Sequence, residues 1–397
     1  MLREFFVNAD FDLSLRRDGA PSPGGARDRQ AEEMAFHFLL LGVDGDSVIV
    51  ALPPDLAFLS YLRECGFPRL ETSVRPSIRR DSCLTPFGWN REAADLNRRY
   101  EIPAAHPPLD VVRRVNGRRF AASVERELCS GDDVSEVLTS VEALEEWVAG
   151  RPSSETEWIL KSEHGNSGLG NRRLRTRDLG EADRKVACRL LSVDECVLVE
   201  PFRQRVLDVS SVFDVDTSGS VHGLHLHEVV STADGAFIGA LFEPESPTLA
   251  PWREDVARVV DFVARQLAEA GYFGPVCLDS FVWDDAGRLV LRPVVDINAR
   301  LHMSVAALEL WREWGRDRVV LWRLFSSRKF RLPSSHHELA RGLGEDAYDA
   351  TARRGIVVTS PLENAGRRLL RVGALFAGAS REEVEGLEGR FRELFEK

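Results

Sequence analysis

The sequence has very little lysine, which makes each lysine informative. It contains four lysines against 48 arginines, so arginine is its ordinary cation. The four are Lys161, Lys185, Lys329 and Lys397. Lys161 directly precedes a glycine-rich stretch, which indicates a specific use for its charge.

Acidic residues outnumber basic ones, 63 to 52. The formal net charge is -11, which argues against nucleic acid or an anionic membrane surface as the main partner, because both are bound through cationic side chains. A small molecule or another protein is the expected partner.

Long apolar runs and paired cysteines are missing as well. No run reaches membrane-spanning length, and acidic residues interrupt residues 1–13, where a signal peptide needs its apolar region. The six cysteines contain no CxxC pair, which favours reduced thiols over disulfides or zinc. We therefore expect a soluble, unprocessed, cytoplasmic protein.

With 397 residues, the chain should form two or three lobes. Strands mixed with helices in the first 75 residues indicate an open α/β lobe, and residues 21–29 are expected to form a mobile loop. The expected strands are 4–7, 36–43, 47–53, 157–161, 196–202, 209–216, 221–230, 275–283, 289–298, 355–361 and 370–378. The expected helices are 55–66, 90–99, 117–128, 135–150, 253–271, 303–325 and 380–395, the last with a Ser380/Glu383 capping box.

The stretch LKSEHGNSGLGN (160–171) follows one of these strands. Its GxxGxG pattern matches neither the dinucleotide fingerprint nor the P-loop. Glycines let backbone N–H groups approach phosphate oxygens, and a nearby lysine adds a point charge. Considered alone, however, the pattern is more typical of a glycine-rich turn.

A second group of polar residues lies on the predicted hairpin 275–298. Asp296 and Asn298 are two residues apart, so they face the same side of one strand, and Asp279 on the neighbouring strand can join them. Two carboxylates and an amide are a ligand set suited to magnesium bound to phosphates. Arg300 follows on the same side and can bind an anionic oxygen. The alternative is that these acids simply end their strands in water.

A third segment, CVLVEPF (196–202), is an apolar strand that ends in Glu-Pro. Its backbone could contact a purine base, with Glu200 accepting a hydrogen bond from a ribose hydroxyl or an exocyclic amine. A core strand ending at proline is the simpler interpretation of this segment by itself.

Four segments resemble, in order and spacing, the motifs of the ATP-grasp superfamily over roughly residues 117–304. They are WILKSEHGNSGLG, VLVEPF, GPVCLDSFVW and VVDINAR. The resemblance implies an α/β (α+β) ATP-grasp fold: an N-terminal lobe (1–115), a small glycine-loop lobe (116–203), a larger metal-binding lobe (204–330) and a C-terminal extension (331–397) that packs on the larger lobe. It implies ATP and Mg²⁺ as cofactors.

The resemblance also implies roles for individual residues. Lys161 and Arg300 would act on the phosphates or the acylphosphate, and Asp279, Asp296 and Asn298 would bind the metal. The implied nucleotide contacts are Arg119, Lys161, Gly165, Ser167, Gly168, Gly170, Glu200, Phe202 and Asp208, with the glycines in a mobile lid over ATP. Arg118 is the alternative to Arg119.

Two departures from the family pattern bear on activity. Aspartate stands at position 296 where the family usually has glutamate, and arginine stands at 118 and 119 where it has lysine. The implied reaction is ATP-dependent activation of a small carboxylic acid, amino-acid or peptide-like, for attack by an amine. A small-molecule kinase on the same fold and a nucleotide-binding module without catalysis remain alternatives.

Other residues are open at this point. His222, His225 and His227 could suggest a metal site. Only His225 and His227 share one strand face, however, and no third nitrogen or thiolate ligand is evident nearby, so a partly exposed strand is the simpler interpretation. His302 is a candidate for the substrate pocket. Asn8, Asp10, Asp12 and residues 89–99 belong to the leading lobe. Apolar strands in the last forty residues could serve a lobe core or a homodimer face.

Overall fold

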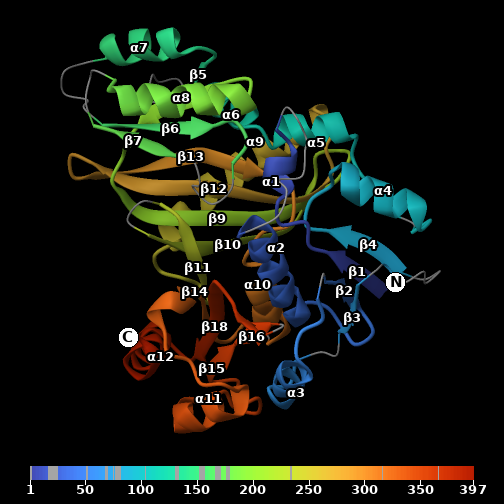
Figure 1. The fold of residues 1–397 in the computed structure, drawn as a ribbon. Coiled ribbons are helices and arrows are strands. Elements are labelled where there is room, and N and C mark those ends of the chain that lie inside the picture. Colours follow the sequence, from blue (N-terminus) through green and yellow to red (C-terminus); the bar gives the residue numbers. More distant parts are fainter. Residues whose placement is uncertain are drawn as a thin grey trace.

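The computed structural model describes residues 2–16, 26–50, 52–67, 70–74, 76, 82–102, 104–129, 134–151, 157–165, 171–175, 179–232, 235–314, 316–364 and 366–397. Three main sheets and their helices build the chain (Figure 1). Within these ranges no helix is both long enough and apolar enough to cross a bilayer.

The N-terminal sheet is parallel, in the order β3-β2-β1-β4. Its strands are β1 (Leu2–Phe6), β2 (Ser47–Ile49), β3 (Glu71–Ser73) and β4 (Ser82–Pro86). The helices of this part are α1 (Phe11–Ser14), α2 (Ala26–His37), η1 (Phe38–Leu40), α3 (Leu56–Glu64), α4 (Arg91–Arg99) and α5 (Leu109–Val115).

The predicted strand 36–43 is wrong, because these residues end α2 and form η1. Phe36 and Phe38 to Leu41 are all buried. A run that is apolar on every side carries no periodicity with which to separate a helix from a strand. The predicted loop 21–29 is shortened at its end by α2, and residues 21–25 lie outside the described ranges.

The small antiparallel sheet has the order β5-β8-β6-β7. Its strands are β5 (Glu136–Leu138), β6 (Trp158–Ser162), β7 (Arg172–Leu174) and β8 (Val197–Pro201). Helices α7 (Val141–Ala149) and α8 (Glu181–Val193) pack on it (Figure 1). The predicted helix 135–150 is thus part strand and part helix, because the Ser140 side chain caps α7 by accepting from the Ala143 amide.

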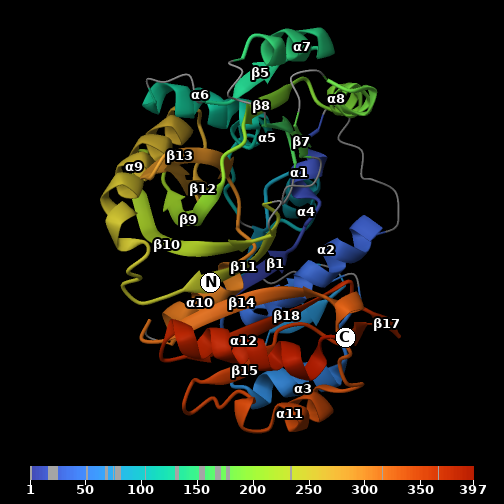
Figure 2. The same cartoon turned by 90° about the vertical axis from the view of Figure 1, so that its left-hand side faces the viewer.

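The large sheet is antiparallel, in the order β13-β12-β9-β10-β11-β14-β18-β15. Its strands are β9 (Arg205–Val215), β10 (Val221–Ser231), β11 (Phe237–Phe242), β12 (Gly274–Asp285), β13 (Arg288–Asn298), β14 (Val319–Ser326), β15 (Gly355–Val358) and β18 (Arg371–Gly378). Helix α6 (Arg118–Leu128) packs on β13, α9 (Arg253–Glu269) on β9 and β10, and α12 (Arg381–Phe395) on β14 and β18 (Figure 2).

The remaining elements are η2 (Ala250–Trp252), α10 (Val305–Glu313), η3 (Ser327–Lys329), α11 (His336–Leu343), η4 (Gly344–Asp346) and the short pair β16 (Glu363–Asn364) and β17 (Arg367–Arg368). The predicted helix 303–325 is right only for α10, since residues 319–326 form β14 between β11 and β18. β15 and β18 are buried in the sheet, so the apolar C-terminal strands serve a lobe core.

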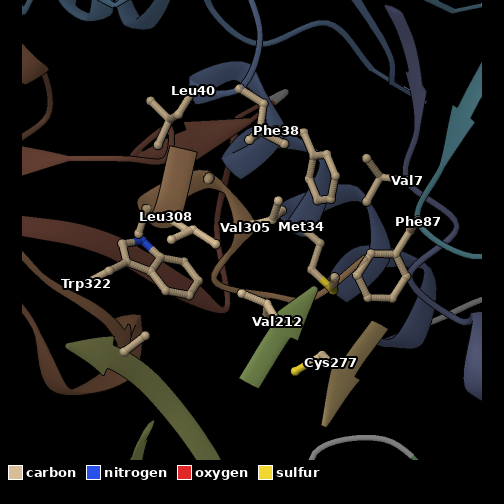
Figure 3. Close-up of a cluster of buried hydrophobic side chains, with 14 of the residues drawn as sticks. Val7, Met34, Phe38, Leu40, Phe87, Val212, Cys277, Val305, Leu308 and Trp322 are labelled. Atoms are coloured by element: carbon tan, nitrogen blue, oxygen red, sulfur yellow. The ribbon is translucent and has the colours of Figure 1, made fainter. Parts of the chain in front are cut away.

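One apolar core joins the N-terminal part to the large sheet (Figure 3). Met34 and Phe38 from the N-terminal part and Val212 and Trp322 from the large sheet belong to the same buried cluster. The end of β13, which carries the predicted site, is therefore held between two parts of the chain that are far apart in sequence.

Candidate active site

Three polar residues stand side by side across the large sheet. Asp279 on β12 is paired directly with Ser210 on β9 and with Asp296 on β13, so the three side chains project from the same face. Asn298 lies two residues beyond Asp296 and faces the same way. The structure thus brings together the three residues predicted to bind a metal.

Hydrogen bonds fix this carboxylate row. The Ser210 hydroxyl donates to Asp279 Oδ1 at 2.5 Å, and Asn298 Nδ2 donates to Asp279 Oδ2 at 3.0 Å. Burial raises the pKa of Asp279 to about 6, against the Ser210 hydrogen bond, and the charge of Asp296 adds to the rise. Two adjacent carboxylates that repel each other favour either a proton or a cation between them.

A divalent cation fits this donor set. Asp279, Asp296 and Asn298 would supply hard oxygen ligands, and a cation would relieve the repulsion that raises the pKa of Asp279. No group of three or more His, Cys, Asp or Glu side chains suited to a metal occurs in the described part of the chain. The set therefore depends on the amide and on oxygens from outside the protein, as is usual for Mg²⁺ held with phosphates.

Two cations from other parts of the chain approach the row. Arg118, the first residue of α6, donates from Nη2 to Asp296 Oδ2 at 3.0 Å and from Nη1 to the Ser162 carbonyl at 2.8 Å. Lys161 on β6 lies at the same cleft, and its Nζ is 2.5 Å from Glu200 Oε1. The cleft is therefore cationic on the small-lobe side and anionic on the large-sheet side.

Glu200 lies near the end of β8, as expected, but its carboxylate binds groups within the protein. Its side chain is 2% exposed, accepts from Ser135 at 2.7 Å, and forms ion pairs with Lys161 and with Arg292 at 2.9 Å. Burial raises the pKa of Glu200, but the charges of Arg292 and Lys161 outweigh this and lower it below its ordinary range. Its carboxylate is fully engaged inside the protein, so the expected side-chain contact to ribose or adenine is not supported.

The other predicted nucleotide contacts are divided. Gly165 and Asp208 line the cleft, and Asp208 pairs with Arg205 at 2.8 Å. Arg119 instead faces Glu163 and Glu195, at 3.4 and 3.6 Å. Of the two candidates Arg118 and Arg119, it is Arg118 that lines the cleft. Phe202 packs under the Arg173 guanidinium and lines a neighbouring groove. Ser167, Gly168 and Gly170 lie outside the described residues, so the lid stays a prediction.

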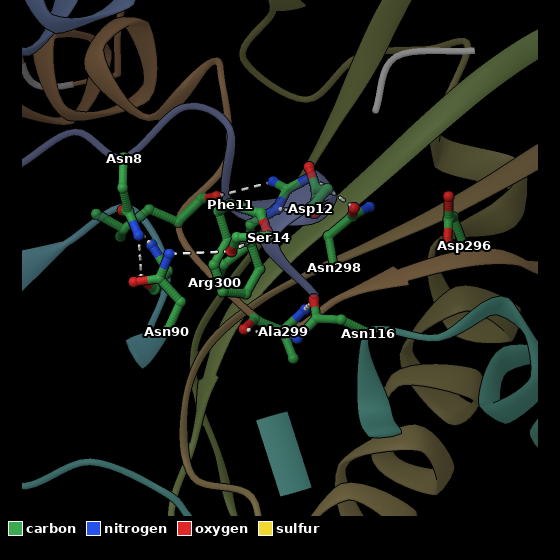
Figure 4. A network of polar contacts seen from close by, with 12 residues as sticks. Asn8, Phe11, Asp12, Ser14, Asn90, Asn116, Asp296, Asn298, Ala299 and Arg300 are labelled. Atoms are coloured by element: carbon green, nitrogen blue, oxygen red, sulfur yellow. Dashed lines mark hydrogen bonds and ion pairs between the residues drawn. The ribbon is translucent and has the colours of Figure 1, made fainter. Parts of the chain in front are cut away.

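Arg300 is buried at the end of the row and is held by the N-terminal lobe. Its Nε and Nη2 donate to the two carboxylate oxygens of Asp12, both at 3.0 Å, and Nη2 also donates to Asn298 Oδ1 at 2.8 Å (Figure 4). Asn116 holds the backbone of Ala299 through its side-chain amide, and the Leu301 amide donates to the Phe87 carbonyl. Next to Phe87, Gly88 permits the close approach of Phe11, because a Cβ there would lie 2.5 Å from the Phe11 ring.

The cleft holds a cavity of about 150 Å³. It is lined by all the groups above that face the row, and also by Phe237, Cys277, His302, Met303 and Ser304. His302 thus lies where the sequence placed it. His222 is exposed and pairs with Asp216 at 2.9 Å, whereas His225 and His227 are largely buried among aromatic rings.

Asp12, Glu125, Ser210 and Arg292 were missed as contributors to the site. Arg292 bonds Glu125 in bidentate fashion at 2.9 and 3.0 Å, across 167 positions of sequence. Ser210 was within a predicted alternating strand, and its register with Asp279 could have been found from hairpin pairing. No local pattern indicates the other three.

Comparison with known proteins places the fold. No protein-family model matches the sequence, and no curated protein matches it. Solved structures do match. Pyruvate carboxylase of Rhizobium etli is 13% identical, with a TM-score of 0.56, over 100% of this chain and 37% of that one. This chain therefore spans little more than a third of that enzyme.

Two further matches cover nearly whole chains. The biotin carboxylase domain of Hydrogenobacter thermophilus 2-oxoglutarate carboxylase has a TM-score of 0.54 and 13% identity over 99% of this chain and 89% of that one. N5-carboxyaminoimidazole ribonucleotide synthetase of Thermus thermophilus has a TM-score of 0.53 and 15% identity over 99% and 98%. These neighbours have ATP-grasp folds. The chain has the ATP-grasp fold, which confirms the resemblance at the level of the fold.

Proposed function

We propose that the protein is an ATP-dependent ligase that activates a small carboxylic acid, amino-acid or peptide-like, as an acylphosphate for attack by an amine. ADP and phosphate are the other products. One observation carries the proposal: a single cleft sets Lys161 and Arg118 against the row of Asp279, Asp296 and Asn298, with Arg300 at its end. The ATP-grasp ligases among the structural neighbours support it.

The chemistry of this cleft is the handling of negative charge. Lys161 and Arg118 oppose phosphoryl oxygens from the small-lobe side, and Arg300 opposes the acylphosphate from the other. Mg²⁺ held by Asp279, Asp296 and Asn298 supplies further positive charge at the phosphates. Burial lowers the pKa of Lys161, the charge of Glu200 opposes that shift, and the ion pair at 2.5 Å fixes the direction of the Lys161 side chain.

The test removes one charge from each side of the cleft. In Lys161→Ala and Asp296→Asn we expect ADP release to fall by about 10² to 10³-fold, the loss typical for one preorganised charge contact. Both variants should fold, because Glu200 keeps Arg292 and Ser135 as partners, and an asparagine oxygen can still accept from Arg118. The measurement is ADP release with Mg²⁺ and pooled amino acids and amines, followed by mass spectrometry of the product.

Lys185→Ala is the matched control, since Lys185 is an exposed lysine of the small lobe that pairs only with Glu181 in the described structure. It should keep wild-type turnover. Wild-type ADP release in both cleft variants would show that the site is assigned wrongly. ADP release without an amide product, with phosphate transferred to an acceptor, would favour a kinase. Nucleotide binding without any turnover would favour a binding module.

A further inference from the structure

We propose that His302 accepts the proton that the attacking amine loses, and that Ser304 and His227 position its ring for this task. This inference rests on the proposed ligase function and adds a residue to it. The amine must shed a proton when it becomes an amide, and a side chain placed in the cleft can receive it.

Elimination among the groups of the cleft leads to His302. The titratable residues that line it are Arg118, Lys161, Arg205, Asp208, Asp279, Cys277, Asp296, Arg300 and His302. The four cations have no lone pair to offer while charged. Asp279 and Asp296 face the metal position, and Asp208 is paired with Arg205 at 2.8 Å. The Cys277 thiol is buried and already engaged by Ser210 at 3.3 Å and by Asp279 at 3.8 Å.

A hydrogen-bonded chain holds the His302 ring. Its Nδ1 lies 2.9 Å from the Ser304 hydroxyl, and that hydroxyl lies 3.1 Å from His227 Nε2. His227 and Ser304 are 1% and 3% exposed, whereas His302, at 8%, reaches the cleft wall. Because Nδ1 is taken by Ser304, Nε2 is the ring nitrogen left for the cleft.

His227, at the far end of this chain of hydrogen bonds, is itself held in place. His227 lies directly opposite Ser210 in the paired strands β10 and β9, one strand removed from Asp279. Its ring stacks on Phe242 with centroids 4.7 Å apart. The chain therefore extends the carboxylate row sideways and sets His302 beside the place where an acylphosphate bound to Arg300 would be attacked.

Burial leaves the His302 ring neutral, with a free lone pair, and also makes it a weak base in the empty cleft. Burial lowers the pKa of His302 to about 3, with a further contribution from the charge of Arg300, so the ring is neutral at pH 7. A phosphate anion on Arg300 offsets that charge and raises the basicity of His302 when the site is filled.

The step balances. The amine nitrogen forms a bond to the acyl carbon, the bond from that carbon to the phosphate oxygen breaks, and phosphate leaves with the electron pair. The proton lost by nitrogen passes to Nε2 of His302 and afterwards to solvent. Ser304 and His227 exchange no proton with the substrate; they hold the ring in one orientation.

The test compares two nucleophiles in one enzyme. Both nucleophiles lose an N–H proton on acylation, but hydroxylamine is a free base at neutral pH and traps acylphosphates without a catalytic base. An alkylamine is almost entirely protonated at that pH and depends on a group that takes its proton. With a pool of protein amino acids as acids, ATP and Mg²⁺, we expect His302→Asn to lower amide formation from methylamine by about 10² to 10⁴-fold. Hydroxamate formation should be unchanged, because asparagine keeps a hydrogen bond to Ser304.

Ser304→Ala should give a weaker form of the same split, and Ser304→Thr, which keeps the hydroxyl, should restore amide formation. This pair also tests the inference if His302→Asn does not fold. His222→Asn, an exposed histidine on β10, is the control and should change neither product.

The outcomes separate the inference from the function beneath it. If His302→Asn forms the amide at the wild-type rate, the role of His302 is overturned but the proposed function stands. A parallel loss of hydroxamate and amide also overturns that role, because it would assign His302 to substrate binding. If the wild-type protein forms neither product and releases no ADP, the proposed function falls and this inference with it.

Discussion

At the residue scale, the orientation of Arg300 is set by the N-terminal lobe. Two of its N–H groups point at Asp12, one at Asn298 and one at the Leu301 carbonyl, while its guanidinium lies 4.8 Å from the centre of the Phe87 ring. Held in this way, the planar guanidinium of Arg300 has one defined direction left in which it can bind a substrate anion. The N-terminal part of the chain therefore fixes the direction of Arg300 through Asp12.

Replacing Asp12 by asparagine should destabilise the protein and weaken turnover together. The change leaves the buried Arg300 charge without its carboxylate, which costs about 3 to 5 kcal/mol in the free energy of unfolding. Urea denaturation followed by circular dichroism measures this loss, and steady-state ADP release measures the turnover. Asp110→Asn, at an exposed aspartate in α5, is the control. Equal stability of both variants would contradict the assigned pairing.

The raised pKa of Asp279 predicts how Mg²⁺ acts at different pH. Because its folded pKa is about 6 against 3.8 ordinarily, the folded state holds the extra proton between these values. Without metal, this group therefore costs stability as the pH rises through about 6. Mg²⁺ binds the deprotonated form, so its stabilising effect should grow as the pH rises through the same range.

Thermal unfolding with and without Mg²⁺ and ADP, at about pH 5 and about pH 7.5, tests this prediction around the shifted pKa. The rise in melting temperature should be clearly larger at the higher pH. In Asp279→Asn the difference between the two pH values should disappear. A metal effect that is the same at both pH values would show that Asp279 is not a ligand.

The candidate site was partly predictable at this scale. Asp279, Asp296 and Asn298 lie on one hairpin with a short turn, so local alternation suffices to place them together. Asp12 and Arg300 are 288 positions apart, and Glu125 and Arg292 are 167 apart. Such pairings depend on how the lobes pack, which no local pattern contains. The choice of Arg118 over Arg119 depends on the exact rotation of α6.

At the scale of elements, strands with strict alternation and helices with caps were predicted best. The capping box at Ser380 is present, since the Ser380 side chain accepts from the Glu383 amide at 3.2 Å, and Glu383 reaches back to the Ala379 amide at 2.7 Å. Segments 36–43 and 319–326 were assigned wrongly because both are apolar on all sides. In such segments the neighbours in space decide between helix and strand.

Arg292 shows how three elements are joined by one buried cation. It lies on β13 and bonds Glu125 of α6 and Glu200 of β8. In Arg292→Met these two buried carboxylates lose their shared partner, and Glu200 keeps Lys161 and the Ser135 hydroxyl. We expect a loss of about 3 to 5 kcal/mol in the free energy of unfolding, measured by chemical denaturation.

Adding Glu125→Gln to that variant should recover part of the loss, because one of the two unpaired charges is removed. Arg288→Met, at an exposed position of the same strand, should be neutral. A neutral Arg292→Met would mean that the buried network contributes nothing to joining α6, β8 and β13.

At the scale of the whole molecule, the C-terminal segment and the candidate site share one sheet. β18 and β15 lie at one end of the eight-stranded sheet, and β13 and β12 lie at the other end. Helix α12 buries Phe391 completely against Phe325 and Phe376, with ring centroids 5.3 and 5.7 Å apart. The small sheet has a buried cluster of its own.

We therefore predict that damage at α12 reaches the site by global opening. Phe391→Ala should lower the free energy of unfolding by about 3 to 5 kcal/mol, the range for a large aromatic side chain removed from a core. Leu394→Ala, three residues on and half exposed, should cost little. Hydrogen exchange read by mass spectrometry should then show equally faster exchange in β18 and in β12, because strands of one cooperative sheet open together. Faster exchange confined to β18 would instead show that the C-terminal segment is a separate unit, whose loss leaves the carboxylate row intact.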